Sequence, residues 1–565
     1  MKLSRVLFVG FLIIFLSGNA TWAQVGWIKE YDNAVVVTAE EHASEAGKSI
    51  LKQGGNAVDA AVAIQFVLSV TLPRAGNIGG GGFMVLHLND GTVASLDFRE
   101  KAPGRAGKEM YIRNGKYVPE LSRQGALAAG VPGTVDGMIK ALERYGRLPL
   151  EAVIAPAIKL AEEGYRLSWS QAKSLNDHAE AFKKFKASAR YFTKLSGTPY
   201  KEGDLFVQKD LAATLSRIAR LGRDGFYSGR TADLIVREME KQGGLISYQD
   251  LKSYESVWRD PVNVTFRGYD LYIMPPPSSG SIAIAQMLNM LKPYDLKGMG
   301  FNSAEYIHLV TEVMRRAFAD RAHFLGDPDF TEIPQQQLTS SLYNKERMNN
   351  FNWKRATSSR DVSSGDVIRY TEPIHTTHFS VVDEDGNAVA VTTTLNGSFG
   401  SHMSVEGAGF VLNNEMDDFT AKPGEPNMFG LIQGEANAIE PGKRMLSSMS
   451  PVIVSQDGEV RMVLGAAGGP RIITATLQSF LNLAIFNMNA QAAISAPRFH
   501  HQWMPDVIFY EPFGINADTQ SILKEIGHRF EEMSTVGRGH IIYVDEHGKR
   551  SGGVDPRGDG AAKGY

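Results

Sequence analysis

The sequence predicts an α+β fold, because antiparallel hairpins and a long helical region lie along one chain of 565 residues. The first hairpin is expected at 83–98, where two β-rich runs flank the turn signal Asn89-Asp90-Gly91. A second hairpin is expected at 376–395, around the turn Asp385-Gly386-Asn387. Between them, about residues 130–350 have a mostly helical pattern that glycine and proline interrupt.

The N-terminus has the three parts of a signal peptide. Lys2 and Arg5 form a charged region, and residues 6–16 form an apolar run too short to cross a bilayer of about 30 Å. Thr21-Trp22-Ala23 then places small residues at the two positions that a signal peptidase reads. We expect residues 1–23 to be removed and the protein to be periplasmic or secreted, with no membrane contact afterwards. An uncleaved membrane anchor is the alternative.

A strand and two helices are expected next. Residues 33–38 form a β-rich run, and a helical pattern follows until Gly54-Gly55 ends it. Asn56 can cap a second, very apolar helix from Ala57 to about Val70.

The segment 354–375 differs from its surroundings. It is rich in Ser, Arg, Asp and Thr and has few large apolar residues, so it can bury little surface. We expect a mobile linker that ends at His375 and leads directly into the second hairpin. A cleavage site needs this arrangement, because the cut ends must separate.

Composition excludes several kinds of chemistry. The chain has no cysteine, which rules out disulfides, thiolate catalysis and cysteine-bound metals. A nucleophile must therefore be Ser, Thr, Lys, His or a carboxylate. The formal net charge of −3 lacks the basic excess that a nucleic-acid partner would need.

Eight segments, in order along the chain, resemble the γ-glutamyltransferase family. They are AGNIGGGGFM at 75–84, LDFREKAP at 96–103, MPPPSSG at 274–280, TTHFSVVD at 376–383, NNEMDDF at 413–419, LSSMSP at 446–451, AAGGPRIIT at 466–474 and APRFHHQW at 496–503. The resemblance implies an N-terminal-nucleophile hydrolase fold, a four-layer αββα sandwich of two stacked antiparallel sheets flanked by helices. It also implies a precursor cut between His375 and Thr376 into subunits 24–375 and 376–565.

A threonine at a new N-terminus has the chemistry for this reaction. Cutting before Thr376 frees an α-amine whose ordinary pKa is about 7.7–8.0, next to the hydroxyl of the same residue. This amine can act as the base for that hydroxyl near neutral pH. Before the cut, Thr376 would attack the carbonyl of His375 and form an ester that water hydrolyses. Taken alone, Thr376 is an ordinary strand threonine, and the other motifs favour the catalytic interpretation.

The resemblance implies two further parts of the catalytic machinery. The family threonine that matches Thr394 hydrogen-bonds the nucleophile's hydroxyl, although Thr392 and Thr393 adjoin it here. Gly468 and Gly469 match the backbone donors for the oxyanion, where glycine allows the substrate to approach the peptide N–H groups closely.

Six residues are expected to bind the γ-glutamyl group, which has an α-carboxylate and an α-ammonium. Arg99 can hold the carboxylate in a bidentate pair, with hydroxyl donors at two serines. An asparagine and two acidic residues can accept from the ammonium. The remaining five residues are Ser447, Ser448, Asn396, Glu415 and Asp418.

Two positions depart from relatives in the family. Glu415 stands where several bacterial relatives carry glutamine, and both residues accept hydrogen bonds. Phe429 lies in the turn-rich segment 423–434, where some relatives place a tyrosine on a lid over the site. In those relatives the tyrosine hydroxyl bonds the asparagine that matches Asn396. Phe429 can therefore cover the site without that bond, or simply pack in the core.

The resemblance implies a γ-glutamyltransferase with glutathione hydrolase activity. It would act on glutathione and other γ-glutamyl compounds, pass the group to water, an amino acid or a dipeptide, and need no metal or cofactor. The first alternative is a related acylase for glutaryl-cephalosporin or N-acyl amides. Glutaryl lacks the ammonium, so Asp418 and Glu415 argue against it. A non-catalytic secreted binding protein is the more distant alternative.

Overall fold

The computed structural model describes residues 28–362 and 376–565. The expected signal peptide, residue His375 and most of the expected linker lie outside the described residues. Among the residues described, no helix combines the length and the apolar character needed to span a membrane.

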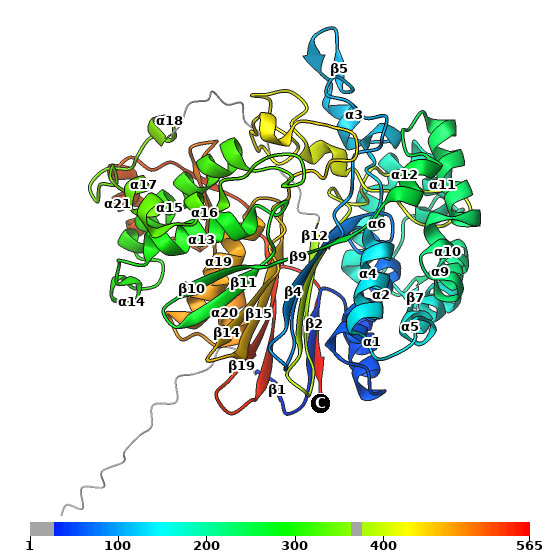
Figure 1. Cartoon of the computed structure of the whole chain (residues 1–565), viewed down its shortest axis with the longest axis horizontal. Coiled ribbons are helices and arrows are strands. Elements are labelled where there is room, and N and C mark those ends of the chain that lie inside the picture. Colours follow the sequence, from blue (N-terminus) through cyan, green and yellow to red (C-terminus); the bar gives the residue numbers. More distant parts are fainter. Residues whose placement is uncertain (1–27, 363–375) are drawn as a thin grey trace, which may run out of the picture.

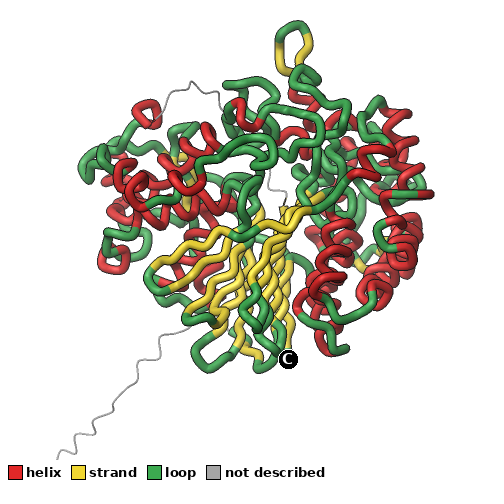
Figure 2. Tube along the Cα trace, viewed as in Figure 1, coloured by secondary structure: helices red, strands yellow, loops and turns green. Residues whose placement is uncertain are grey.

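Two seven-stranded antiparallel sheets form the centre of the molecule (Figure 2). Sheet I contains, in spatial order, β21 (Ala561–Gly564), β2 (Val35–Thr38), β12 (Thr376–Val382), β13 (Ala388–Thr394), β3 (Gly81–His87), β4 (Val93–Asp97) and β9 (Val257–Arg259). Sheet II contains β1 (Glu30–Tyr31), β20 (Arg550–Val554), β19 (Arg538–Val544), β15 (Glu459–Ala467), β14 (Val452–Gln456), β11 (Tyr269–Ile273) and β10 (Val262–Phe266).

Small sheets and many helices surround the two main sheets. The short strands are β16 (Phe499–His500), β17 (Ile508–Tyr510), β18 (Phe530–Glu532), β5 (Ile112–Arg113), β6 (Lys116–Tyr117), β7 (Tyr165–Arg166) and β8 (Leu205–Phe206). The helices on the side of sheet I include α1 (Glu41–Lys52), α2 (Ala57–Thr71), α4 (Thr134–Tyr145), α5 (Leu150–Glu163), α6 (Trp169–Asp177), α7 (Ala179–Lys183), α8 (Lys186–Phe192), α9 (Lys209–Leu221), α10 (Asp224–Tyr227) and α11 (Gly229–Gln242). On the side of sheet II they include α13 (Gly280–Leu291), α14 (Leu296–Met299), α15 (Ala304–Phe324), α16 (Gln335–Leu338), α17 (Ser341–Arg347), α18 (Ser359–Val362), α19 (Arg471–Ala484), α20 (Ala490–Ser495) and α21 (Ala517–Glu525). The remaining helical segments are α3 (Pro119–Arg123), α12 (Tyr248–Ser253), and the 3₁₀ turns η1 (Ala126–Ala128), η2 (Glu415–Asp418) and η3 (Glu435–Asn437).

Three apolar cores join four layers, in the order helices, sheet I, sheet II, helices (Figure 1). The core between the sheets contains Val37 and Val85 of sheet I and Val463 and Ile542 of sheet II. A larger core lies between sheet I and α1, α2, α4 and α5, and another between sheet II and α13, α15 and α19. This arrangement confirms the expected αββα sandwich.

Helix α2 shows why the local sequence folds as expected. Asn56 accepts hydrogen bonds from the N–H groups of Val58 and Asp59, and the Asp59 carboxylate accepts from Asn56 N–H in return. All fifteen residues of α2 are buried. A helix that is apolar on every side is stable only inside a protein, and α2 lies between sheet I and the outer helices.

Both predicted hairpins are present in sheet I. β3 pairs with β4, and β12 pairs with β13 from Val382 opposite Ala388 to Thr376 opposite Thr394. The observed bounds agree with the expected ones to within two residues. The helical region 130–350 also contains strands β7 to β11, which were not predicted separately from the sequence.

The first part of the expected linker is anchored to the protein. Ser359 is buried, its N–H donates to Asp506 at 3.0 Å, and Trp503 Nε1 donates to its carbonyl oxygen at 2.9 Å. The Thr357 N–H donates to Glu312 at 3.0 Å. Polar contacts therefore hold residues that bury little apolar surface, and the mobility of the linker stays a prediction.

We predict that Asn56→Ala destabilises the protein by about 1–3 kcal/mol, because it removes a helix cap and the donor to the Tyr145 carbonyl oxygen at 2.7 Å. Asn516→Ala is the matched control, since Asn516 caps the peripheral helix α21 and is exposed. Denaturant unfolding should show the larger loss for Asn56→Ala. An equal or smaller loss would contradict the structural role given to this cap.

Candidate functional site

Thr376 and Thr394 lie side by side at the end of sheet I where the central strand β12 begins and its neighbour β13 ends. They are direct partners in the antiparallel register, and their Oγ1 atoms lie 3.5 Å apart. Both line a cavity with about 330 Å³ of empty space. Because side chains alternate along a strand, Thr377 lies on the opposite face of β12 and does not line this cavity.

A backbone and side-chain network positions this pair of threonines. The Asn396 N–H donates to Thr394 Oγ1 at 2.8 Å. Asn77 Nδ2 donates to the Thr394 carbonyl oxygen at 2.8 Å and to Thr393 Oγ1 at 3.0 Å. Asn77 was not predicted from the sequence, although it lies inside the glycine-rich segment 75–84.

The glycine pair follows β15 and precedes α19. Gly468 and Gly469 have φ values of +136° and +56°, which residues with a side chain rarely adopt. A Cβ at Gly469 would lie 2.8 Å from the Phe429 ring. Gly469 lines the cavity. The pair also lies at the N-terminal end of α19, where the helix dipole is positive. The peptide groups of Gly468 and Gly469 therefore allow another group to approach closely, and they lie in the positive potential of the α19 N-terminus.

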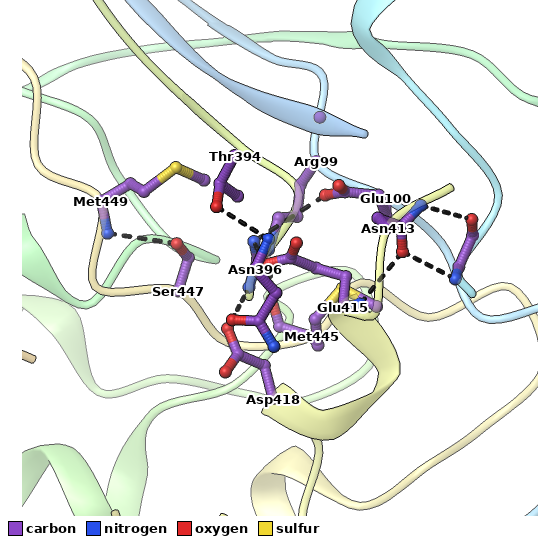
Figure 3. A network of polar contacts seen from close by, with 12 residues as sticks. Arg99, Glu100, Thr394, Asn396, Asn413, Glu415, Asp418, Met445, Ser447 and Met449 are labelled. Carbon is purple, nitrogen blue, oxygen red and sulfur yellow. Dashed lines mark hydrogen bonds and ion pairs between the residues drawn. The ribbon is translucent and has the colours of Figure 1, made fainter. Parts of the chain in front are cut away.

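Arg99 is the centre of a buried charge cluster (Figure 3). Its Nη1 pairs with Glu415, and its Nη2 pairs with Asp418 Oδ2 at 2.6 Å. Its Nε and Nη2 also donate to the carbonyl oxygens of Met445 and Leu446, at 3.2 and 3.3 Å. The sequence predicted that Arg99 binds the substrate's carboxylate and that Glu415 and Asp418 bind the substrate's ammonium. In the structure, the Arg99 guanidinium pairs with these two acids.

A third carboxyl group makes the cluster more crowded. Glu100 is fully buried, with one oxygen 3.8 Å from Arg99 Nη1. Burial raises the pKa of Glu100 to about 7 and that of Asp418 to about 6, and it also raises the pKa of Glu415. Three carboxyl groups around one guanidinium favour retention of a proton at neutral pH.

Both expected serines line the cavity, beside an arginine that the sequence analysis missed. Arg321 of α15 is buried, and its Nη2 donates to Ser448 Oγ at 3.2 Å. Its Nε donates to Ser279 Oγ at 2.9 Å, and the Ser279 hydroxyl donates to the Ser447 carbonyl oxygen at 2.7 Å. Burial lowers the pKa of Arg321 to about 10. Nothing in the sequence distinguishes Arg321 from the other arginines of the same helix.

The segment 423–434 has neither helix nor strand and covers one side of the cavity. Asn427 Nδ2 donates to Asp418 Oδ1 at 3.3 Å, and Phe429 is buried against Gly469. The segment residue that contacts the Asn396 side chain is Met428, whose sulfur lies 3.6 Å from Asn396 Nδ2. The Phe429 ring lies beside Gly469, and Phe429 and Asn396 both line the cavity.

Another polar cluster lies outside the cavity. Among the described residues, His308, Glu312 and His528 come close enough to hold a metal ion. However, Glu312 already pairs with Arg315 and Arg316, whose positive charges oppose a bound cation. This group is better described as a buried ion-pair cluster.

We predict that Glu100→Gln changes the pH dependence of stability. A buried acid with a raised pKa binds its proton more tightly in the folded protein than in the unfolded chain. Its contribution to the free energy of unfolding is therefore complete below about pH 4.5 and is lost as the pH rises through about 7. Glutamine is neutral throughout, so the variant should be the more stable protein at about pH 8 and should lose this advantage near pH 5.

Denaturant unfolding at several pH values measures this difference, and Glu109→Gln, at an exposed position, is the control. Parallel pH profiles for wild type and Glu100→Gln would contradict a proton on Glu100.

Comparison with known proteins places this geometry in a family. The family model described as Gamma-glutamyltranspeptidase matches residues 43–565. A glutathione hydrolase proenzyme of Pseudomonas aeruginosa is 45% identical over 564 residues, covering 99% of this chain and 98% of the relative. A cephalosporin acylase from Bacillus halodurans has a similar structure, with a TM-score of 0.85, 27% identity, and coverage of 98% of this chain and 99% of its own. The γ-glutamyltranspeptidase of Helicobacter pylori is 48% identical, with a TM-score of 0.57, over 58% of this chain and 94% of the solved chain. The chain therefore belongs to the γ-glutamyltranspeptidase family.

Proposed function

We propose that this protein is a self-cleaving γ-glutamyltransferase and glutathione hydrolase that uses Thr376 as its nucleophile. One observation carries the proposal: Thr376 begins a central strand, its hydroxyl faces that of Thr394, and both share a cavity with the Arg99 charge cluster. The family acts on γ-glutamyl substrates and is processed from a proenzyme into two subunits.

Maturation uses the Thr376 hydroxyl first. Its oxygen attacks the carbonyl carbon of His375, the peptide C–N bond breaks, and the released nitrogen takes a proton to become the α-amine. Water then hydrolyses the ester between the two residues. The products are subunits 24–375 and 376–565, with a signal peptide removed from the N-terminus and a periplasmic or secreted location.

Catalysis repeats this chemistry on a γ-glutamyl amide. The α-amine accepts the proton of the Thr376 hydroxyl as the oxygen attacks the γ-carbonyl carbon. The N–H groups of Gly468 and Gly469 stabilise the oxyanion, and the leaving amine takes the proton. Water, an amino acid or a dipeptide then takes the γ-glutamyl group from the ester. Thr394 holds the nucleophile's hydroxyl in place.

The Arg99 cluster suits a zwitterionic substrate. An α-carboxylate can replace Asp418 or Glu415 on the guanidinium, while the α-ammonium pairs with the displaced carboxylate. Each charge then has a partner of opposite sign, which a buried site requires. Ser447, Ser448 and Asn396 supply hydrogen-bonding groups, and Arg321 adds positive potential on the carboxylate side.

A glutaryl acylase is the second candidate, since the Bacillus halodurans structure resembling this chain is a cephalosporin acylase. A glutaryl group brings a carboxylate without an ammonium. It would displace an acid from Arg99 and leave that acid unpaired in a buried cluster, at a cost of several kcal/mol. The charge count therefore favours the glutamyl substrate.

Segment 423–434 is proposed as a lid, with Phe429 covering the glycine pair. Its ring packs on Gly469, so its movement would open the cavity next to the proposed oxyanion site.

We predict that Thr376→Ala blocks both cleavage and turnover, because one hydroxyl serves both reactions. Thr377→Ala is the matched control, since its side chain lies on the other face of β12 and should leave both measurable. Denaturing electrophoresis reports cleavage, and release from a γ-glutamyl anilide reports turnover. A Thr376→Ala protein that still separates into two fragments would refute the assignment.

We also predict that Asp418→Asn lowers kcat/KM for γ-glutamyl substrates far more than for glutaryl substrates. Loss of a buried charge partner costs about 2–5 kcal/mol for the ammonium-bearing substrate. Asp417→Asn is the neighbouring control: Asp417 bonds Ser122 and the Met428 N–H, so its loss should affect both substrates alike. Equal losses of kcat/KM for the two kinds of substrate in Asp418→Asn would show that Asp418 does not bind the ammonium.

A further inference from the structure

Two arginines with different partners line the cavity that holds Thr376. Arg99 makes ion pairs with carboxyl groups. Arg321 comes from α15, in the helical layer that packs on sheet II (Figure 1), and its hydrogen bonds go to the neutral hydroxyls of Ser279 and Ser448. Its Nη1 is buried and has no hydrogen-bond partner within residues 28–362 and 376–565. The two guanidinium groups therefore differ in whether an acid neutralises them by direct contact.

The burial of Arg321 is expensive because its direct partners carry no charge. Its side chain is almost fully buried, and with its pKa lowered to about 10 by burial it still keeps its proton at neutral pH. A hydroxyl replaces the lost hydration of a cation less well than a carboxylate does. Asp418 acts on Arg321 from a longer distance, but its ion pair is with Arg99. A carboxylate that enters the cavity can therefore be stabilised by a charge that no ion pair already uses.

Ser448 connects Arg321 to the space of the cavity. Its Oγ accepts a hydrogen bond from Arg321 Nη2 at 3.2 Å, and both residues line the cavity. A guanidinium can only donate, so the Ser448 hydroxyl keeps its own proton for another acceptor. A hydrogen bond from a cation also polarises the hydroxyl and strengthens it as a donor. Ser448 is thereby prepared to donate to a carboxylate.

Arg321 also holds the segment that carries both serines. Its Nε donates to Ser279 Oγ at 2.9 Å, and the N–H and the hydroxyl of Ser279 both donate to the Ser447 carbonyl oxygen at 2.7 Å. The Ser447 hydroxyl accepts from the Met449 N–H at 3.1 Å, so its proton is also available to a substrate. One guanidinium therefore positions Ser448 directly and Ser447 through Ser279.

We propose that Arg321 is a positioning residue that makes the site selective for substrates with a free α-carboxylate, and that it acts mainly through the Ser448 hydroxyl. The role rests on the proposed γ-glutamyltransferase function and names the source of its carboxylate selectivity. The Ser448 proton goes to one carboxylate oxygen, while Arg99 binds the other. The ammonium of the substrate stays with the acids beside Arg99 and does not depend on Arg321.

Three anilides that differ only at the α-carbon test this role. The γ-glutamyl anilide has both charges, the glutaryl anilide lacks the ammonium, and the 4-aminobutyryl anilide lacks the carboxylate. Arg321→Gln should lower kcat/KM at least about tenfold for the first two and less than about twofold for the third, because only the carboxylate loses a charge-assisted donor. Assays at about pH 8 keep Asp418 ionised, since its pKa is about 6.

Arg316→Gln is the matched control for the loss of a buried arginine. Arg316 belongs to the same helix and is as deeply buried, but it pairs with Glu312 and does not line the cavity. Any loss that it causes should be the same for all three anilides. An equal loss for all three anilides in Arg321→Gln would show a structural role only and would overturn the proposal.

A double-mutant cycle with Ser448→Ala gives a second test that uses the γ-glutamyl anilide alone. If Arg321 acts through Ser448, Arg321→Gln should cost much less in the Ser448→Ala protein than in the wild type. Additive losses would overturn the proposal. Thermal unfolding reports whether Arg321→Gln folds, and Arg321→Lys replaces it if it does not, because lysine keeps the charge but loses the planar fork that serves two serines.

The same assays separate failure of this role from failure of the proposed function. A wild-type protein without γ-glutamyl turnover would reject the proposed function, and the role of Arg321 with it. A wild-type protein that turns over the γ-glutamyl anilide, with equal losses for the three anilides in the Arg321 variant, would reject only the role of Arg321.

Discussion

The position of Thr376 depends on the register of β12 within sheet I. β12 pairs with β13 along its whole length, but with β2 only over Ser380–Val382. The first residues of β12 are therefore fixed by β13 on one side, and within residues 28–362 and 376–565 no strand pairs with their other side. An N-terminal nucleophile needs both properties, because it must be held in place and still have space for a substrate.

Contact between the two sheets supports this register. His378 is buried between them and bonds Thr392 at 2.9 Å and Ser380 at 3.0 Å. A Cβ at Gly465 of sheet II would lie 2.2 Å from the His378 ring, so glycine is needed opposite the histidine. A one-residue slip of β12 would turn Thr376 to the helix-facing side and remove it from the cavity.

The Arg99 cluster shows a different balance between stability and function. Burying an arginine with three carboxyl groups is expensive, and its ion pairs and hydrogen bonds offset only part of that cost. The arrangement leaves charges that can exchange partners with a zwitterion, which a well-packed apolar core could not do. The Phe429 ring packs beside Gly469, and both line the cavity. A movement of the proposed lid would therefore change the contact with the proposed oxyanion donors.

The sequence by itself determined the local elements and the chemical type of the site. Capping at Asn56, the two hairpin turns and the glycine pair depend on residues close together in the chain, so their patterns predict structure directly. Motif resemblance also selected Thr376, Thr394, Asn396 and Asp418, which line one cavity. Only the tertiary structure decided which charges pair. Arg99 is 316 positions from Glu415, and Arg321 contacts Ser448 from α15, a helix of the layer that packs on sheet II. The same holds for Met428 beside Asn396 and for the anchoring of residues 356–359. Such contacts depend on which segments the layers bring together, because ion pairing and packing act through space, whereas turn and capping signals act along the chain.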